Sequence, residues 1–136
     1  MPYTFSKPYL PEDCDEGVCG ETIAAGQLVA RKTDGLLWLA NAALNAVMPA
    51  IGIAEVDGNA TDATRITVVR KCAEMKGASG LTVGAELYVG ESAGTITTSR
   101  PSTHLDAVQS IGHAKSATTF VFDIGNGNTE QIGITS

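Results

Sequence analysis

The sequence predicts an all-β protein: a small β-barrel or barrel-like sandwich built from two similar β-units, with at most a short helix near 41–47. One observation is a repeat, in which three motifs recur in the same order at offsets of 58, 59 and 60 residues. The pairs are 23–29 (IAAGQLV) with 81–89 (LTVGAELYV), Gly35 with Gly94, and 51–54 (IGIA) with 111–114 (IGHA). A second observation is that most apolar runs are short, β-prone and bounded by glycine. Together these patterns indicate a repeated unit of short strands and turns.

Length and composition are compatible with one compact domain. Of the 136 residues 43% are hydrophobic, and a chain of this length can bury roughly two-thirds of its unfolded surface. Only 18% are charged, against about 25% in ordinary soluble domains. The net charge is −6 and no Lys/Arg cluster occurs, so we expect no direct binding to nucleic acid. No apolar run approaches the length that spans a bilayer and no signal-peptide pattern is present, so no membrane contact is expected.

Residues 1–21 predict an extended N-terminal arm ahead of a single β domain at 22–136, whose pseudo-repeat covers about 23–56 and 81–115. Prolines bias the arm toward extended backbone geometry, and an acidic segment follows them. Aromatic side chains in such a leader favour docking on a neighbour, as an added strand or into pockets, over a frayed terminus. The expected interface residues of the arm are Pro2, Tyr3, Phe5, Tyr9 and Leu10.

Short strands are expected throughout the domain, because the apolar runs are rich in β-branched residues and are separated by Gly, Asn or Asp turns. Residues 65–73 form the most strand-like run, although its two faces do not alternate cleanly. Residues 118–124 do alternate, with Phe120 and Phe122 on one face. Residues 41–47, rich in Ala, Asn and Leu, predict a short helical turn. The other expected strands are 23–31 with a break at Gly26, 36–40, 50–56, 81–89, 94–98, 107–115 and an edge strand at 131–135.

The three cysteines, Cys14, Cys19 and Cys72, are expected to be reduced thiols. A Cys14–Cys19 disulfide is the first alternative, and it would leave one thiol unpaired. A zinc site that adds a histidine is the second, but a C-x4-C spacing without another spaced pair fits zinc poorly.

The sequence contains no convincing catalytic set. The histidines are His104 and His113, and His113 occupies the position of Ile53 in the repeat, so that position tolerates an aliphatic side chain. Nucleophile-elbow, zinc-protease and phosphate-loop motifs do not occur, and the acidic turn at 57–62 lacks calcium-loop spacing. The GNGN run at 125–128 is typical of a turn. We therefore predict no enzyme activity, no metal and no cofactor.

A carrier domain is the remaining cofactor-related alternative. The first repeated motif is similar to one in biotinyl and lipoyl carrier barrels, which are also built from two similar halves. Those barrels carry their cofactor on a lysine at a hairpin tip. Lys71 and Lys76 instead flank the long predicted strand and its following turn, which disfavours this alternative.

Four motifs carry a family resemblance: 23–29, 50–54 (AIGIA), 81–89 and 109–114 (QSIGHA). With them, the body from 22 to 123 resembles the capsid decoration, or head cement, proteins of tailed bacteriophages. The resemblance covers about three quarters of the chain, and its motifs are glycine-turn patterns of small β-barrels. It implies a non-enzymatic β-protein on the outer face of the expanded capsid, commonly a trimer at threefold or quasi-threefold sites. Such proteins clamp neighbouring major capsid subunits against the pressure of packaged DNA.

The expected partners are therefore the major capsid protein and neighbouring copies of this chain as a homotrimer, and the expected location is the outer surface of the virion after assembly in the host cytoplasm. The arm that contains Cys14 and Cys19 matches no pattern of the family. The alternative function is a virion or tail β-module that binds a receptor or glycan. That function would require aromatic side chains gathered over a groove, whereas the body carries only Trp38, Tyr88, Phe120 and Phe122.

Overall fold

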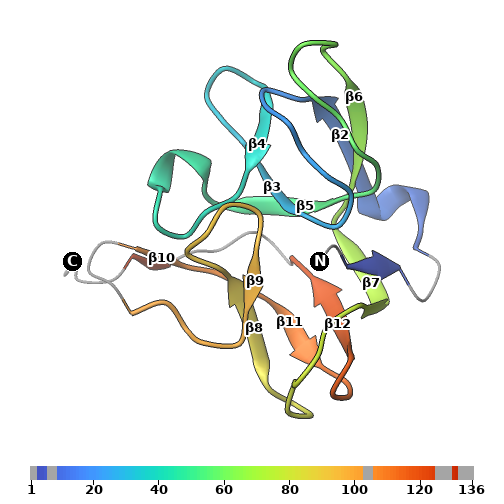
Figure 1. Ribbon diagram of the computed structural model, residues 1–136, viewed down its shortest axis with the longest axis vertical. Coiled ribbons are helices and arrows are strands. Elements are labelled where there is room, and N and C mark those ends of the chain that lie inside the picture. Colours follow the sequence, from blue (N-terminus) through green and yellow to red (C-terminus); the bar gives the residue numbers. More distant parts are fainter. Residues whose placement is uncertain (1–2, 6–8, 103–105, 125–129, 132–136) are drawn as a thin grey trace.

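The computed structural model of the chain describes residues 3–5, 9–102, 106–124 and 130–131, and this part is all-β, which confirms the predicted fold class. A five-stranded sheet forms the upper part of the molecule in Figure 1 and a six-stranded sheet the lower part. A separate ladder pairs β10 (Ala107–Val108) with β13 (Glu130–Gln131). The one-turn 3-10 helix η2 (Asn45–Val47) lies where a helical turn is predicted, and a second, η1 (Pro11–Asp13), lies in the predicted arm.

The upper sheet is antiparallel and has the order β2-β6-β5-β3-β4. Its two outer strands are joined by a bridge between Cys19 and Leu37, next to which the Gly20 N–H donates to the Leu37 carbonyl at 2.7 Å. This junction curls the sheet toward barrel closure. The strands are β2 (Cys14–Val18), β3 (Leu28–Arg31), β4 (Leu37–Leu39), β5 (Ala50–Ala54) and β6 (Arg65–Val69).

The lower sheet is also antiparallel and has the order β1-β7-β12-β11-β8-β9. In its inner strand β12 (Thr119–Asp123), Phe120 and Phe122 are buried and Asp123 is exposed, as the alternation of residues 118–124 predicts. The strands are β1 (Thr4–Phe5), β7 (Lys71–Lys76), β8 (Glu86–Val89), β9 (Ile96–Thr97), β11 (Ser110–Ala114) and β12 (Thr119–Asp123).

The two sheets repeat one topology. Without β1, the order β7-β12-β11-β8-β9 matches β2-β6-β5-β3-β4 strand for strand, because the five strands of each sheet follow the chain in the same sequence. The turn hydrogen bonds repeat as well: the Gly26 N–H donates to the Ala54 carbonyl and the Gly84 N–H to the Ala114 carbonyl, each at 2.9 Å. The sequence repeat thus has a counterpart in the topology, and each unit also includes the strand that precedes its repeated motifs.

Gly52 on β5 and Gly112 on β11 lie at matching positions of the two units. A Cβ on Gly52 would come within 2.5 Å of the Val69 carbonyl oxygen on β6. A Cβ on Gly112, whose φ is +146°, would overlap the Val121 carbonyl oxygen on β12. The Ile-Gly-x-Ala motif therefore recurs because a strand of each unit approaches the backbone of its neighbour too closely for a side chain.

The prediction of one strand at 65–73 is wrong, because these residues belong to β6 in the upper sheet and to β7 in the lower sheet. Arg70 lies at the crossing: its N–H donates to the Asp13 carbonyl at 2.7 Å, and its own carbonyl accepts from the Ile124 N–H at 3.1 Å. The two parts bury side chains in different sheets, which explains the irregular alternation. The expected strand at 107–115 is likewise divided, at Gln109, into β10 and β11.

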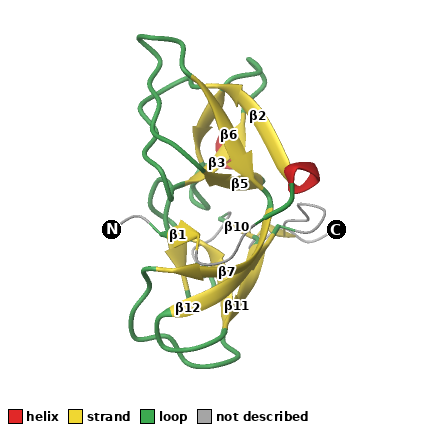
Figure 2. Cartoon of the chain, turned by 90° about the vertical axis from the view of Figure 1, so that its right-hand side faces the viewer, coloured by secondary structure: helices red, strands yellow, loops and turns green. Residues whose placement is uncertain are grey.

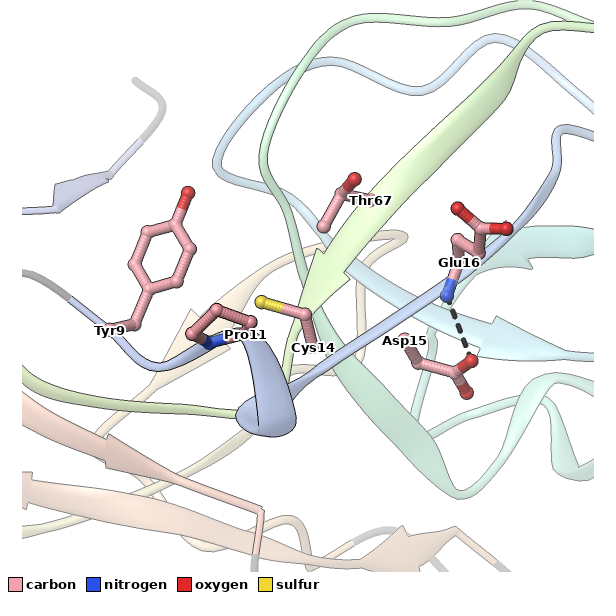
Figure 3. A pocket seen from close by; sticks show the side chains of 6 residues that line it. All are labelled: Tyr9, Pro11, Cys14, Asp15, Glu16 and Thr67. Atoms are coloured by element: carbon pink, nitrogen blue, oxygen red, sulfur yellow. Dashed lines mark hydrogen bonds between the residues drawn. The ribbon is translucent and has the colours of Figure 1, made fainter.

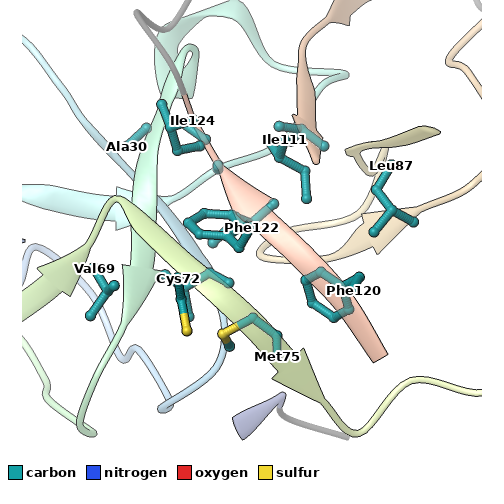
Figure 4. Close-up of a cluster of buried hydrophobic side chains, with 14 of the residues drawn as sticks. Ala30, Val69, Cys72, Met75, Leu87, Ile111, Phe120, Phe122 and Ile124 are labelled. Carbon is teal, nitrogen blue, oxygen red and sulfur yellow. The ribbon is translucent and has the colours of Figure 1, made fainter. Parts of the chain in front are cut away.

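One hydrophobic core joins the two units. Phe120, Phe122, Met75 and Leu87 from the lower sheet share a cluster with side chains of the upper sheet such as Val69. Figure 4 shows the two phenylalanines of β12 in this cluster. A second cluster fills the curled upper sheet; its buried members are Cys19, Ile23, Val29, Leu37, Ala54, Ile66 and Val68.

Polar contacts reinforce the junction between the units. The buried Gln109 side chain accepts from the Ala50 N–H at 2.7 Å and donates to the Ala50 carbonyl at 3.0 Å, so its amide replaces a strand partner. The turn at Gly94 reaches the upper sheet, where the Gly94 N–H donates to the Ala40 carbonyl at 2.7 Å. A Cβ at the matching Gly35 would have no atom within 4 Å, so the corresponding turn of the first unit is open.

Candidate protein-interaction site

The predicted interface residues of the N-terminal arm lie on the body of their own chain. β1 pairs with β7 through Thr4–Lys76 and Phe5–Met75, and Figure 2 shows the two strands together. The Tyr3 ring meets Phe120 edge to face at a centroid distance of 5.3 Å, and burial raises the pKa of its hydroxyl. The Phe5 and Tyr9 rings are 5.0 Å apart, and all three rings pack against the shared core. Leu10 is 54% exposed, and Pro2 falls outside the described residues.

The structure corrects the second half of the arm predicted at 1–21, because this part contains a strand of the upper sheet. β2 pairs with β6 over five residues, from Cys14–Val69 to Val18–Arg65, and is a strand of the upper sheet. The sequence conceals this strand because Asp and Glu are depleted in strands. Here Asp15 faces Arg31 at 3.5 Å, and the neighbouring Glu16 faces Arg65 at 3.4 Å.

Replacing Tyr3 by alanine is expected to lower the free energy of unfolding by about 1 to 3 kcal/mol, because a half-buried aromatic ring leaves the core. Leu10→Ala should change it by less than about 0.5 kcal/mol, because that side chain is exposed. Urea unfolding followed by circular dichroism measures both. Equal effects of the two substitutions would contradict the docked position of the arm.

A shallow groove of about 470 Å³ lies beside β2. Tyr9 and Pro11 approach it from the segment before the strand, Cys14, Asp15 and Glu16 line it from β2 and its start, and Thr67 comes from β6 (Figure 3). It therefore offers apolar surface at one end and the Glu16 carboxylate at the other, whereas the Asp15 carboxylate lies on the other side of β2 (Figure 3). Sequence reasoning misses it because Thr67 joins the lining only through the β2–β6 pairing.

The electrostatic environment of the groove is acidic. Four of the five residues from 12 to 16 are Asp or Glu. Burial raises the pKa of the Cys14 thiol, and the negative charge of Asp13 raises it further, so this cysteine is a neutral thiol at pH 7. The ion pairs of Asp15 and Glu16 with arginine are both substantially exposed, and such surface pairs contribute little, about 0 to 1 kcal/mol.

Side chains of β2 and β3 occupy the backbone groups of Glu16 at the outer edge of β2. The Glu16 N–H donates to Asp15 Oδ1 at 2.8 Å, the bond drawn in Figure 3, and the Glu16 carbonyl accepts from Arg31 Nη2 at 3.0 Å. At the other outer strand, the Leu39 N–H donates to Glu21 Oε2 at 2.8 Å. Covered edge groups protect a sheet against pairing with a foreign strand.

The other residues considered from sequence are dispersed. None of the three cysteines forms a disulfide among the described residues; Cys19 lies in the core of the upper sheet, and Cys72 lies in the shared core, where its thiol donates to the Glu74 carbonyl at 3.2 Å. Within the described ranges, no three His, Cys, Asp or Glu side chains gather as metal ligands. His113 is exposed on β11, Lys71 and Lys76 end β7, and His104 and residues 125–128 lie outside the described ranges. The part of the chain that the structure describes has no helix long and apolar enough to cross a membrane.

The single tryptophan, Trp38, is engaged by its own chain. The Lys32 ammonium lies 4.2 Å from the centre of the ring, and the indole N–H donates to Asp34 Oδ2 at 3.2 Å. The backbone of Gly20 also lies against the indole, because a Cβ there would come within 2.5 Å of Cε2. These contacts leave little ring surface for stacking on a sugar.

A buried carboxyl, that of Asp106, lies near the junction of the units and interacts with the exposed side chain of Glu91. Asp106 is 6% exposed, and a side-chain hydrogen bond with Glu91 raises its pKa, as do burial and the charge of Glu91. Asp106 Oδ2 has no hydrogen-bond partner among the described residues. The adjacent backbone links the units, since the Ala107 N–H donates to the Ala42 carbonyl at 2.8 Å and the Ala42 N–H to the Gly90 carbonyl at 2.9 Å.

This pair predicts a pH dependence of stability. The folded state holds the Asp106 proton more tightly than the unfolded state, so its contribution is complete below the ordinary carboxyl pKa and is lost as pH rises through the raised value. Relative to Asp106→Asn, the melting temperature of the wild-type protein should therefore fall as pH rises above about 4, over the range in which the raised pKa lies. Thermal melts across this range measure the difference, and parallel curves for the two proteins would contradict it.

No family model matches the chain, and no curated protein matches its sequence.

Proposed function

We propose that this protein is a capsid decoration protein of a tailed bacteriophage, which binds the outer surface of the mature head and clamps neighbouring major capsid subunits. The proposal rests on the position in the fold of the four motifs that resemble those of the capsid decoration family. They supply β3, β5, β8 and β11 together with the glycine turns beside them, so they form the repeated frame of both units. The motifs that carry the resemblance thus belong to the frame that the two units share, which supports the proposal.

The physical properties of the body suit a clamp. A protein that holds subunits against pressure must resist deformation, and close-packed interiors have low compressibility. The two units share one core and are also joined by Gln109 and the Gly94 turn. The covered edges of β2 and β4 disfavour uncontrolled sheet pairing in a crowded lattice.

The N-terminal segment has two roles in this proposal. Tyr3, Phe5 and Tyr9 are used by the body itself, because their rings pack against its core. Leu10 and the groove beside β2 remain available to a neighbour, either the major capsid protein or another copy in a homotrimer. This assignment narrows the expected docking surface from the whole arm to the segment around β2.

Cosedimentation with heads of the phage that encodes the protein, stripped of decoration, tests the proposal. The purified protein is expected to bind expanded heads, to bind unexpanded heads weakly, and to raise the temperature at which expanded heads break. A reconstruction of the saturated particle should show three copies at threefold or quasi-threefold positions. Equal affinity for both head forms, or binding to host cells or glycans without binding to heads, would reject it in favour of a receptor-binding module.

A further inference from the structure

We propose that the outer edge of β9 in the second unit accepts an extended, uncharged strand of a partner protein, through backbone hydrogen bonds to Ile96 and Thr98. β9 is the last strand of the lower sheet (Figure 1). The chemistry of the occupant follows from the chain itself, because the first unit contains the same edge in a closed form. The source of the strand, a segment of the major capsid protein, rests on the proposed function.

The backbone groups of Ile96 and Thr98 point away from β8. The Gly90 N–H donates to the Thr95 carbonyl at 2.8 Å, so these two residues form a hydrogen-bonded pair where the β8–β9 ladder begins. Hydrogen-bonded and non-hydrogen-bonded pairs alternate along antiparallel strands. Ile96 and Val89 form the next pair, which is of the second kind, and Thr98 has the same orientation two residues later. Both residues therefore present N–H and carbonyl groups at the outer edge of the sheet.

In the first unit, the chain itself completes the equivalent edge. Leu37 and Leu39 of β4 hold the positions of the two β9 residues, at the repeat offset of 59 residues (37 to 96 and 39 to 98). The Leu37 carbonyl accepts from the Gly20 N–H at 2.7 Å. The Leu39 N–H donates to Glu21 Oε2 at 2.8 Å. The segment that follows β2 thus supplies one donor and one acceptor to this edge.

In the second unit, the corresponding segment bonds elsewhere. Ala78 and Gly20 each lie two residues beyond the end of their strand, β7 or β2. The Ala78 N–H donates to the Thr118 carbonyl at 3.3 Å. Among the described residues, no hydrogen bond reaches the outward groups of Ile96 or Thr98. The edge that the first unit closes is therefore open in the second, and an unpaired strand edge is a template for another strand.

A groove of about 280 Å³ beside β9 leaves room for this strand. Thr95 and Ile96 border it from the lower sheet, Gln27 borders it from the first unit, and Tyr3 from the arm. Tyr3 and Ile96 also line a smaller cavity of about 30 Å³, so the Tyr3 ring does not fill the space along the strand. An extended chain rises about 3.3 Å per residue, so about three residues reach from Ile96 to Thr98.

The lining of this groove selects uncharged side chains. The described residues around it carry no charge, and several are glycine or alanine. An ionised side chain of the occupant would lose water there without gaining an opposite charge. The occupant is therefore recognised through its backbone and has small, uncharged side chains where it faces the groove.

A peptide titration tests the strand chemistry without a capsid. The probe is the uncharged pentapeptide Thr-Val-Thr-Val-Thr with acetylated and amidated ends, and the control carries a methyl group on every amide nitrogen. The probe should shift the amide NMR signals of Ile96 and Thr98 saturably and slow their hydrogen exchange, and the methylated control should do neither. Leu37 and Leu39, whose edge is closed, are the internal comparison. The inference is wrong if Ile96 and Thr98 do not respond, or if Leu37 and Leu39 respond equally.

Binding to expanded heads then tests the partner. Thr98→Pro removes the outward N–H without breaking a bond to β8, and proline is tolerated on an edge strand where the N–H faces outward. This variant should lower the affinity for heads by about tenfold or more, because the partner loses its donor. Thr98→Ala, which keeps the N–H, should change the affinity less than about twofold. Thermal melts verify that both variants are folded.

Hydrogen exchange of the wild-type protein gives a measure that does not depend on a variant. Exchange at 96–98 should be slower on expanded heads than in the free protein, whereas exchange in the exposed turn at 61–62 should not change. If the wild-type protein binds heads and exchange at 96–98 is unchanged, the inference fails while the proposed function stands. If it binds no heads, the proposed function fails, and the peptide titration alone decides on the edge.

A second copy of the chain is the other protein that could supply the strand. In that case, exchange at 96–98 would slow as the protein concentration rises without heads, and light scattering would show larger species that Thr98→Pro abolishes. That result would overturn the capsid segment as the occupant. Exchange that is independent of concentration in solution and slows only on heads supports it.

Discussion

Alanine in place of Gly112 is expected to prevent folding or to lower the free energy of unfolding by about 4 kcal/mol or more, a loss that few single substitutions cause. The added Cβ would overlap the Val121 carbonyl oxygen, and the φ of +146° is itself unfavourable for a side chain. Relief requires β11 and β12 to separate at the centre of the lower sheet, beside Phe122. Soluble yield and urea unfolding measure the effect.

Two other glycines serve as matched controls. Gly35→Ala should cost about 1 to 2 kcal/mol, because its φ of +83° is unfavourable but its Cβ would face open space. Gly52→Ala should lie between the two, since its Cβ would come within 2.5 Å of the Val69 carbonyl oxygen while its φ is not in the left-handed range. If Gly112→Ala is as mild as Gly35→Ala, the close approach of β11 to β12 is wrong.

Gln109→Met is expected to lower the free energy of unfolding by about 2 to 6 kcal/mol, because each buried backbone group left without a partner costs about 1 to 3 kcal/mol. Methionine keeps most of the volume of the side chain but can neither accept from the Ala50 N–H nor donate to the Ala50 carbonyl. Ala50 is itself buried, so water cannot replace the lost bonds without opening the junction between the units.

The neighbouring exposed residue provides the comparison for Gln109. Ser110→Ala removes one surface hydrogen bond to Glu86 and should cost less than about 1 kcal/mol. Denaturant unfolding of both variants gives the two free energies under the same conditions. Similar values for Gln109→Met and Ser110→Ala would show that the Gln109 amide does not hold the units together.

Much of the frame is predictable from local patterns. Glycine turns and aliphatic runs mark β3, β5, β8 and β11, and the alternation of Phe120 and Phe122 marks β12, because each signal lies within a few residues. The strand change at Arg70 is not local: it depends on hydrogen bonds to Asp13 and Ile124, about 55 residues away on either side. The sign of this strand change in the sequence is the irregular alternation of apolar and polar residues across 65–73.

The candidate site is likewise predictable in its local features but not in its long-range contacts. The apolar character of Tyr3, Phe5 and Tyr9 indicates that they dock, but the sequence does not reveal that the surface they meet belongs to their own chain. β2 is missed because its carboxylates argue against a strand, and the arginines that face them come from β3 and β6. The groove forms only where β2 pairs with β6, so it cannot be predicted from a sequence that conceals β2.

The two equivalent turns of the repeat differ in one respect that matters for engineering. The Gly94 N–H donates to the Ala40 carbonyl, whereas the Gly35 backbone bonds only within its own hairpin, to Lys32 and Arg31, and a Cβ there would face open space. Extra residues inserted beside Gly94 would have to pass through the junction of the units, but a peptide inserted beside Gly35 would project into solvent from a hairpin whose strands remain paired. The chain can therefore present a foreign epitope at the open tip of its first unit, and the copy of that tip in the second unit cannot.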